Sequence, residues 1–465
     1  MKNPFCSKLT AFYLSLIALI AVVDSQIPRP SQSKQSQSKR SQLEQVLKAN
    51  QPFLQAASSE ATSGNIEASF QSDTQYVFDS ANPALTQSLQ NLRYQELSEA
   101  TQRFLATLTA AQRAEVVNPF DNPFRTRAFC YVLARCRDEY VGLRMSALSS
   151  EQKIALNNLL MKSFSGSGYS RAIQTMNHEW LIEETENAHR ADPENYPTVG
   201  SPLVESWTPP PQRSAPDFYI AFFGEPASMG EWGMRFEGHH LSLNLTFGGE
   251  GEQPTVGIAP MFFGSSPMIV PEAPAIAEGE VNPYPQWQQR EGQQLLHRET
   301  WLARSFLQSL DMETLAAGTW SALPDVVLAG GADVPLDAAS YLNGEKEGIA
   351  VAALNPVQQS LVMDFALEFL QLQASHHIET DEFKANLMNA RVWWFGDRDD
   401  EQADLYFRVQ SDRYLIEILQ SNTFAVLSEI DSNHVHASFR DLTSDWDHNS
   451  LGAHLRHYHD TATVH

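Results

Sequence analysis

The stretch Trp-Gly-Met-Arg-Phe-Glu-Gly-His-His-Leu-Ser-Leu-Asn-Leu-Thr-Phe, residues 232–247, is the strongest fold signal because it alternates strictly from His239 onward. Successive side chains of a β-strand point to opposite faces, so the alternation predicts a strand with one apolar and one polar face. The polar positions are His240, Ser242, Asn244 and Thr246. Such a face usually contacts water, but an imidazole, a hydroxyl and an amide at two-residue spacing could also form a site on a strand.

Similar patterns predict strands on both sides of this stretch. The predicted strands are residues 218–223, 255–258, 260–264, 405–409, 414–419, 424–430 and 434–440. Apolar residues at helical spacing predict helices elsewhere. These helices fall within 86–190 and over 286–310, 355–373 and 381–391.

Two local signals refine the helical region. Ser149-Ser-Glu-Gln before an apolar run predicts a capped helix, whereas Gly166–Tyr169 interrupts the pattern before a helix at about 170–187. Prolines between 193 and 211 place a boundary near 200–215. The predicted fold is therefore α+β, with a helical part at about 86–200 and a mixed β-sheet with packed helices at about 215–460.

Composition limits the classes of partner. The chain has 465 residues, of which 42% are hydrophobic, enough for a large core. Its net charge of −24 argues against binding nucleic acid or an anionic membrane. Residues 26–65 are rich in Ser, Gln and Lys and predict a disordered linker.

The N-terminus has the features of a secretory signal. Lys2 and Lys8 are followed by the apolar run Leu9–Val23, and a cleavage zone falls within residues 21–25. We expect residues 1–25 to direct the protein to a secreted or periplasmic location, without a stable membrane span after cleavage. The alternative is an uncleaved anchor, although the apolar run is short for a spanning helix.

Two cysteines, Cys130 and Cys136, follow the predicted signal. A pair in an exported protein suggests a disulfide. On a continuous helix they would lie about 9 Å apart, too far for a bridge. A disulfide therefore requires a turn between them, and the alternative is two buried thiols.

A second alternating stretch, Asn433-His-Val-His-Ala-Ser-Phe-Arg440, suggests a metal site. His434 and His436 share one face of the predicted strand and could bind one metal ion. His240 on the opening strand is the candidate third ligand, whereas its neighbour His239 points to the other face, as a packed imidazole. Two histidines with a carboxylate suit iron, and three histidines suit zinc or copper. A His-x-His pair also occurs by chance.

Three further residues are candidates for catalysis. Glu417 lies on the apolar face of a predicted strand, where a carboxylate requires a partner, either a metal or an arginine such as Arg408 or Arg413. Asn244 and Arg440 could orient an anionic or carbonyl-bearing substrate through hydrogen bonds. We expect Glu417 to act as a ligand or a base.

Several common enzyme signatures are missing from the sequence. It contains no Gly-x-Ser-x-Gly, Walker loop, dinucleotide-binding glycine pattern, His-Glu-x-x-His or Cys-x-x-Cys. Because these motifs are missing, the sequence gives no support to a serine hydrolase, a nucleotide cofactor or a thioredoxin-like enzyme.

The chain resembles the DUF3500 family, a domain of unknown function, over roughly residues 95–460. The resemblance rests on residues 218–228, on Glu-Gly-His-His-Leu-Ser-Leu-Asn within 233–246, and on 260–264, 405–417 and 433–441. It implies one α+β domain over 86–460 and draws attention to the same polar rows. It implies no reaction.

Three functions remain open. The first is a metal-dependent oxidoreductase or hydrolase that binds one iron, copper or zinc ion and acts on a small polar substrate. The second is a secreted, non-catalytic protein that binds a polar ligand. The third is a structural module whose histidines only form hydrogen bonds. Close approach of His240, His434 and His436 would favour the first.

Overall fold

The computed structural model describes eleven stretches of one compact unit, Val77–His465. They are residues 83–126, 140–191, 218–226, 231–248, 255–320, 322–324, 327, 348–373, 380–421, 433–442 and 445. The predicted signal, the linker, both later cysteines and the strand predicted at 424–430 lie outside these residues.

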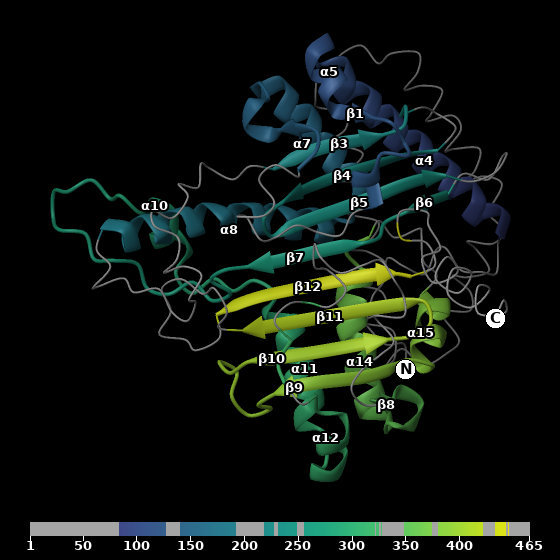
Figure 1. Ribbon diagram of the computed structural model, residues 1–465, viewed down its shortest axis with the longest axis vertical. Coiled ribbons are helices and arrows are strands. Elements are labelled where there is room, and N and C mark those ends of the chain that lie inside the picture. The colour runs from purple at the N-terminus through teal and green to yellow at the C-terminus, as the bar shows by residue number, and fades with distance from the viewer. Residues whose placement is uncertain are drawn as a thin grey trace, which may run out of the picture. The chain divides into compact units, whose positions relative to one another are not determined.

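The centre of the fold is a 12-stranded mixed sheet (Figure 1). Its strand order is β1-β3-β4-β5-β7-β12-β11-β10-β9-β8, with β2 on β3 and β6 on β5. β1 and β3 are parallel, and the other pairs are antiparallel. The strands are β1 Val117–Asn118, β2 Leu143–Arg144, β3 Tyr219–Phe223, β4 Trp232–Gly238, β5 Leu241–Gly248, β6 Thr255–Gly257, β7 Met261–Ser265, β8 Ile349–Ala350, β9 Arg391–Gly396, β10 Leu405–Gln410, β11 Tyr414–Ser421 and β12 His434–Asp441.

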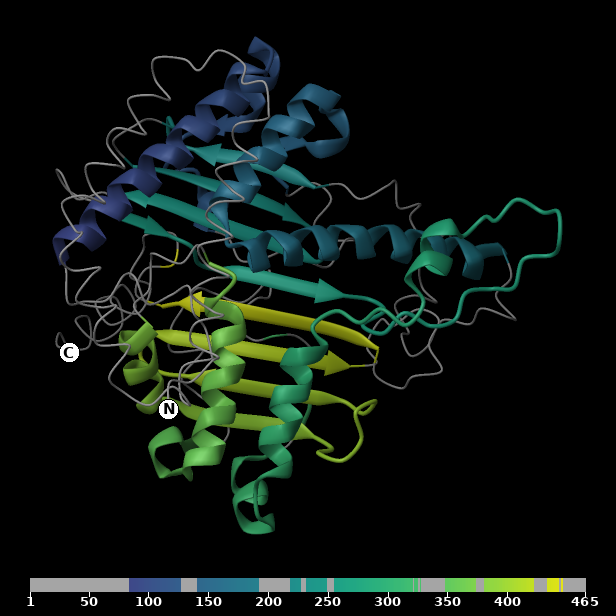
Figure 2. The same cartoon turned by 180° about the vertical axis from the view of Figure 1, so that it is seen from behind.

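The helices lie mostly over one face of this sheet, as the view from behind shows (Figure 2). They are α4 Pro83–Ala106, α5 Ala110–Val116, α7 Ser150–Ser163, α8 Gly166–Ala191, α10 Pro285–Arg290, α11 His297–Gln308, α12 Met312–Gly318, α14 Pro356–Leu370 and α15 Thr380–Met388. None of the helices in the described ranges is both long and apolar enough to cross a lipid bilayer.

The two faces of the sheet have different contents. Leu243, Phe263 and Phe407 belong to the large core, which also contains side chains of α4, α7, α11 and α14. The opposite face carries polar side chains such as Ser242 and Asn244, and these are buried too. The expected alternation is therefore present, but the polar face of β5 does not contact water.

The α+β prediction is confirmed. The capped helix is also present, because the Ser149 hydroxyl accepts a hydrogen bond from the Gln152 backbone and the Gln152 side chain accepts one from the Ser149 backbone. The helical part is not purely helical, since its short strands β1 and β2 pair with β3.

Four predicted boundaries are wrong. The helix at 286–310 is divided into α10 and α11, because Gly292 and Leu296 adopt φ angles of 74° and 60°, outside the helical region. α8 begins at Gly166, within the stretch expected to interrupt the helices. The helix predicted to reach residue 391 ends at Met388, and β9 follows. The opening strand begins at Leu241, because the two histidines before it form a turn.

Candidate metal centre

His239 and His240 form the two-residue connection between β4 and β5. Gly238 and Leu241 on either side are paired in the antiparallel ladder, which fixes where the connection lies. The two rings lie close together, with centroids 3.8 Å apart and planes inclined by 32°.

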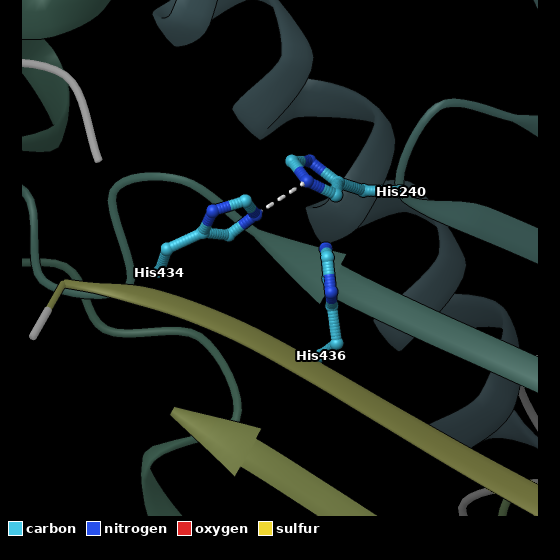
Figure 3. Close-up of side chains that lie close together, drawn as sticks. All are labelled: His240, His434 and His436. Atoms are coloured by element: carbon cyan, nitrogen blue, oxygen red, sulfur yellow. Dashed lines mark hydrogen bonds between the residues drawn. The ribbon is translucent and has the colours of Figure 1, made fainter. Parts of the chain in front are cut away.

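His434 and His436 are at the beginning of β12, at the same end of the sheet (Figure 3). They are two residues apart and therefore share one face. β7 lies between β5 and β12, and its Gly264 is the register partner of His436. The Gly264 N–H donates to the carbonyl of His240 at 2.8 Å. One glycine thus lies between imidazoles from the two flanking strands.

Gly264 provides the space in which these rings meet. A Cβ atom there would lie 2.6 Å from Cδ2 of His240 and 2.7 Å from Cδ2 of His436. Contacts that short essentially do not occur, so any side chain would displace one or both imidazoles.

We call His240, His434 and His436 the histidine cluster. The Nε2 atoms of His240 and His434 are 3.1 Å apart and share a hydrogen bond (Figure 3), and each of the three residues offers a ligand atom within 4.8 Å of the others. Two nitrogen ligands of a tetrahedral ion lie about 3.3 Å apart when each bond is about 2.0 Å. The residues are 0%, 7% and 8% exposed, respectively. The cluster could therefore hold a metal ion with little rearrangement.

The electrostatics of His436 suit metal binding. Burial, followed by the neighbouring His434, His240 and His239, holds its pKa well below the usual value of 6.5. His436 is therefore neutral near pH 7, which is the form that binds metal ions.

Glu179, near the middle of α8, contacts both turn histidines. Its Oε1 lies 2.7 Å from Nδ1 of His240, and its Oε2 lies 3.2 Å from Nδ1 of His239. Burial alone would raise the pKa of this carboxyl, but the two imidazoles outweigh burial and hold the pKa well below 4.5. Glu179, His239 and His240, which we call the turn group, also have ligand atoms within 4.8 Å of one another.

The sequence interpretation did not include Glu179 or the role of His239. One usable signal was present: Glu179 follows Met176 by three residues and therefore lies on the buried side of the helix. Glu417 was selected for a similar reason, because it is a carboxylate on the apolar face of a predicted strand.

The structure does not place Asn244 or Arg440 in either group of candidate ligands. Asn244 accepts a hydrogen bond from Nε of Arg235 at 2.8 Å and donates to the carbonyl of Pro260 at 2.9 Å. Arg440 donates through Nε to Asp445 Oδ2 at 2.5 Å. Each residue is four positions along its strand from the nearest cluster histidine, which corresponds to about 13 Å.

Glu417 is closer to the histidine cluster but has other partners. It lies opposite Ser438 and Arg408, and therefore diagonal to His436. Its Oε1 accepts a hydrogen bond from the Tyr406 hydroxyl at 2.5 Å. Burial, then Glu417, holds the pKa of Tyr406 well above 10, so the phenol retains its proton. Among the described residues, Glu417 is not part of a candidate ligand group.

The fold and site together define an α+β protein with a buried histidine–glutamate cluster at one end of its central sheet. Comparison with family models matches residues 90–448 to the family described as "Protein of unknown function (DUF3500)", and the chain belongs to that family. No curated protein and no solved structure matches it.

Proposed function

We propose that this chain is an exported metal-dependent enzyme in which His240, His434 and His436 bind one transition-metal ion. The observation that carries the proposal is the 3.1 Å approach of the two Nε2 atoms. These residues lie 194 positions apart in the chain. Gly264 supports the proposal independently, since a larger residue would close the space between the rings.

The composition of the cluster favours zinc or copper. Three imidazoles without a carboxylate form a common ligand set for both metals, whereas iron is more often held by two histidines and a carboxylate. Three protein ligands leave a coordination position for water or substrate. Zinc in this setting would support hydrolysis of a small polar substrate, and copper would support its oxidation.

The remaining candidates support the site less directly. Asn244, Arg440 and Glu417 are buried and engage Arg235, Asp445 and Tyr406, respectively. These contacts favour a role in holding the polar face of the sheet together. We therefore base the proposed chemistry on the histidine cluster alone.

Elemental analysis of the exported protein, purified without a metal-binding tag, tests the proposal. We expect tightly bound zinc or copper, and a loss of affinity of roughly 100- to 1,000-fold in His434→Ala and in His436→Ala. Four ligands of a zinc site share about 10–16 kcal/mol, so one ligand contributes about 2.5–4 kcal/mol. His297→Ala, outside the cluster, is the matched control. A protein that binds neither metal after incubation with each ion would contradict the proposal.

The low exposure of the rings favours a second candidate, a secreted protein that binds a ligand without catalysis. Substituting cobalt and adding azide distinguishes the two functions. A change in the visible spectrum indicates a coordination position open to exogenous ligands, as an enzyme requires. An unchanged spectrum in a fully loaded protein indicates a closed site and favours the non-catalytic function.

A further inference from the structure

We propose that the turn group, Glu179, His239 and His240, forms a second metal site that shares His240 with the first. The inference rests on the proposed function, which makes His240 a ligand of the first site through the Nε2 atom that faces the histidine cluster. It concerns the other side of the same imidazole, where Nδ1 faces Glu179.

The geometry divides the two nitrogens of His240 between two sets of partners. On the Nε2 side lies Nε2 of His434 at 3.1 Å. On the Nδ1 side lies Oε1 of Glu179 at 2.7 Å, and the second oxygen of that carboxylate is 3.2 Å from Nδ1 of His239. The histidine cluster and the turn group each offer three ligand atoms within 4.8 Å of one another. One ring is common to both sets.

The contact between Glu179 and His240 is short and buried. Oε1 of Glu179 lies 2.7 Å from Nδ1 of His240, close enough for the ring N–H to donate a hydrogen bond to the carboxylate. Atoms that bind a common ion lie roughly 3 Å apart when their bonds are about 2.1 Å. A cation at this place would therefore replace the proton between two atoms that already have the spacing of ligands.

The charges are also consistent with a cation. A buried carboxylate requires a compensating positive charge, and a divalent ion would supply it. Both Glu179 and the histidines are ligands for zinc or copper.

Sharing has a defined chemical consequence for His240. Both nitrogens can bind metal only after the ring loses its remaining N–H proton, which passes to solvent. The ring then bridges the two ions as an imidazolate, which places them about 6 Å apart, given bonds of about 2 Å to each nitrogen.

Metal stoichiometry of the full chain is the first test. We expect two equivalents of Cu²⁺ in the wild type, one in Glu179→Gln and one in His434→Ala, which removes a ligand from the first site only. Glu184→Gln is the matched control, because Glu184 lies on the same helix but accepts hydrogen bonds from the backbone of Gln286 and Trp287. It should retain two equivalents.

Electron paramagnetic resonance of the copper-loaded wild type is the second test. Its main result is obtained on the wild type and does not depend on whether a variant folds. The unpaired electrons of two Cu²⁺ ions joined through an imidazolate should couple magnetically. The resonance signal of the wild type should therefore be weaker than the signal of two separate Cu²⁺ ions. Glu179→Gln should give an uncoupled signal of one ion. One equivalent in the wild type, unchanged in Glu179→Gln, would overturn the second site and leave the first intact. Two uncoupled ions would overturn the shared ring, and no bound metal would overturn both proposals.

Discussion

The histidine cluster and the polar positions farther along the same sheet face are all buried, but their partners differ. Arg235, Arg440 and Tyr406 each meet a group that can accept their hydrogen: Asn244, Asp445 and Glu417, respectively. The cluster instead brings three imidazoles together, and His240 and His434 share a hydrogen bond between Nε2 atoms 3.1 Å apart. An amide or carboxylate partner stabilises a buried donor without any ligand. A ring nitrogen can exchange its proton for a metal ion, so we expect the cluster, and not the other pairs, to depend on metal.

Under the proposed function, this difference would separate structural from functional candidates on one surface. In the sequence, Asn244, Arg440 and His436 all appear as polar residues on alternating strands. Only the identity of the atoms opposite them distinguishes their roles. The following substitutions therefore test whether the complementary pairs affect stability alone and whether the cluster affects metal binding.

The largest expected loss of stability is in Asp445→Ala. The substitution removes a fully buried carboxylate that accepts hydrogen bonds from Nε of Arg440 and from the backbone of Asp441. Breaking a buried ion pair costs about 3–5 kcal/mol in the free energy of unfolding, because the remaining charge stays buried. Urea unfolding measures the loss, and the metal bound per folded molecule should not change. Loss of metal from the folded variant would show that this pair belongs to the centre.

Gly264→Ala should act on the cluster without removing any ligand. The new Cβ atom would displace His240 or His436, and we expect metal affinity to fall about 10- to 100-fold, as when ligand orientation is lost. Competition with a chelator measures the affinity. The control is Gly233→Ala, because a Cβ on Gly233 would have an ordinary contact of 3.4 Å with the carbonyl oxygen of Leu245. Equal metal affinities in Gly264→Ala and Gly233→Ala would show that the space at Gly264 does not position the imidazoles for metal binding.

Part of the histidine cluster could be predicted from sequence, because strand alternation determines that His434 and His436 share a face. His434 and His436 lie two positions apart, and His240 belongs to another alternating stretch. The pairing order β5-β7-β12, which brings the two stretches together, is not encoded in either stretch. The proximity of His240 was therefore a hypothesis that required the structure.

Glu179 could not be assigned in this way, because its position depends on how α8 passes the end of the sheet. Helical periodicity shows that Glu179 is on a buried side, but not that the β4–β5 turn lies against it. Asp445, the partner of Arg440, is likewise fixed by the path of the chain after β12. Tertiary contacts of this kind also decide that Asn244 faces Arg235.

Asn244→Ala should have a moderate effect on stability. It removes the oxygen that accepts the 2.8 Å hydrogen bond from Arg235, and a buried donor left without its acceptor costs about 1–3 kcal/mol. Thermal unfolding measures this loss, with the exposed Asn389→Ala as the control. Metal content should remain at the wild-type level. A folded variant that loses metal or ligand binding would instead support a role for Asn244 in the site.

The smallest expected effect is the pH dependence that His436 contributes to the metal-free protein. Its pKa is well below 6.5 in the folded state, because burial and the neighbouring imidazoles disfavour the charged ring. The unfolded chain therefore binds a proton at higher pH than the folded chain does, so the free energy of unfolding falls as the pH decreases below 6.5. Urea unfolding at about pH 7.5 and about pH 5.5 should show a smaller decrease in His436→Asn than in the wild type. His297→Asn is the control, and identical decreases in the wild type and His436→Asn would contradict a low pKa of His436 in the folded state.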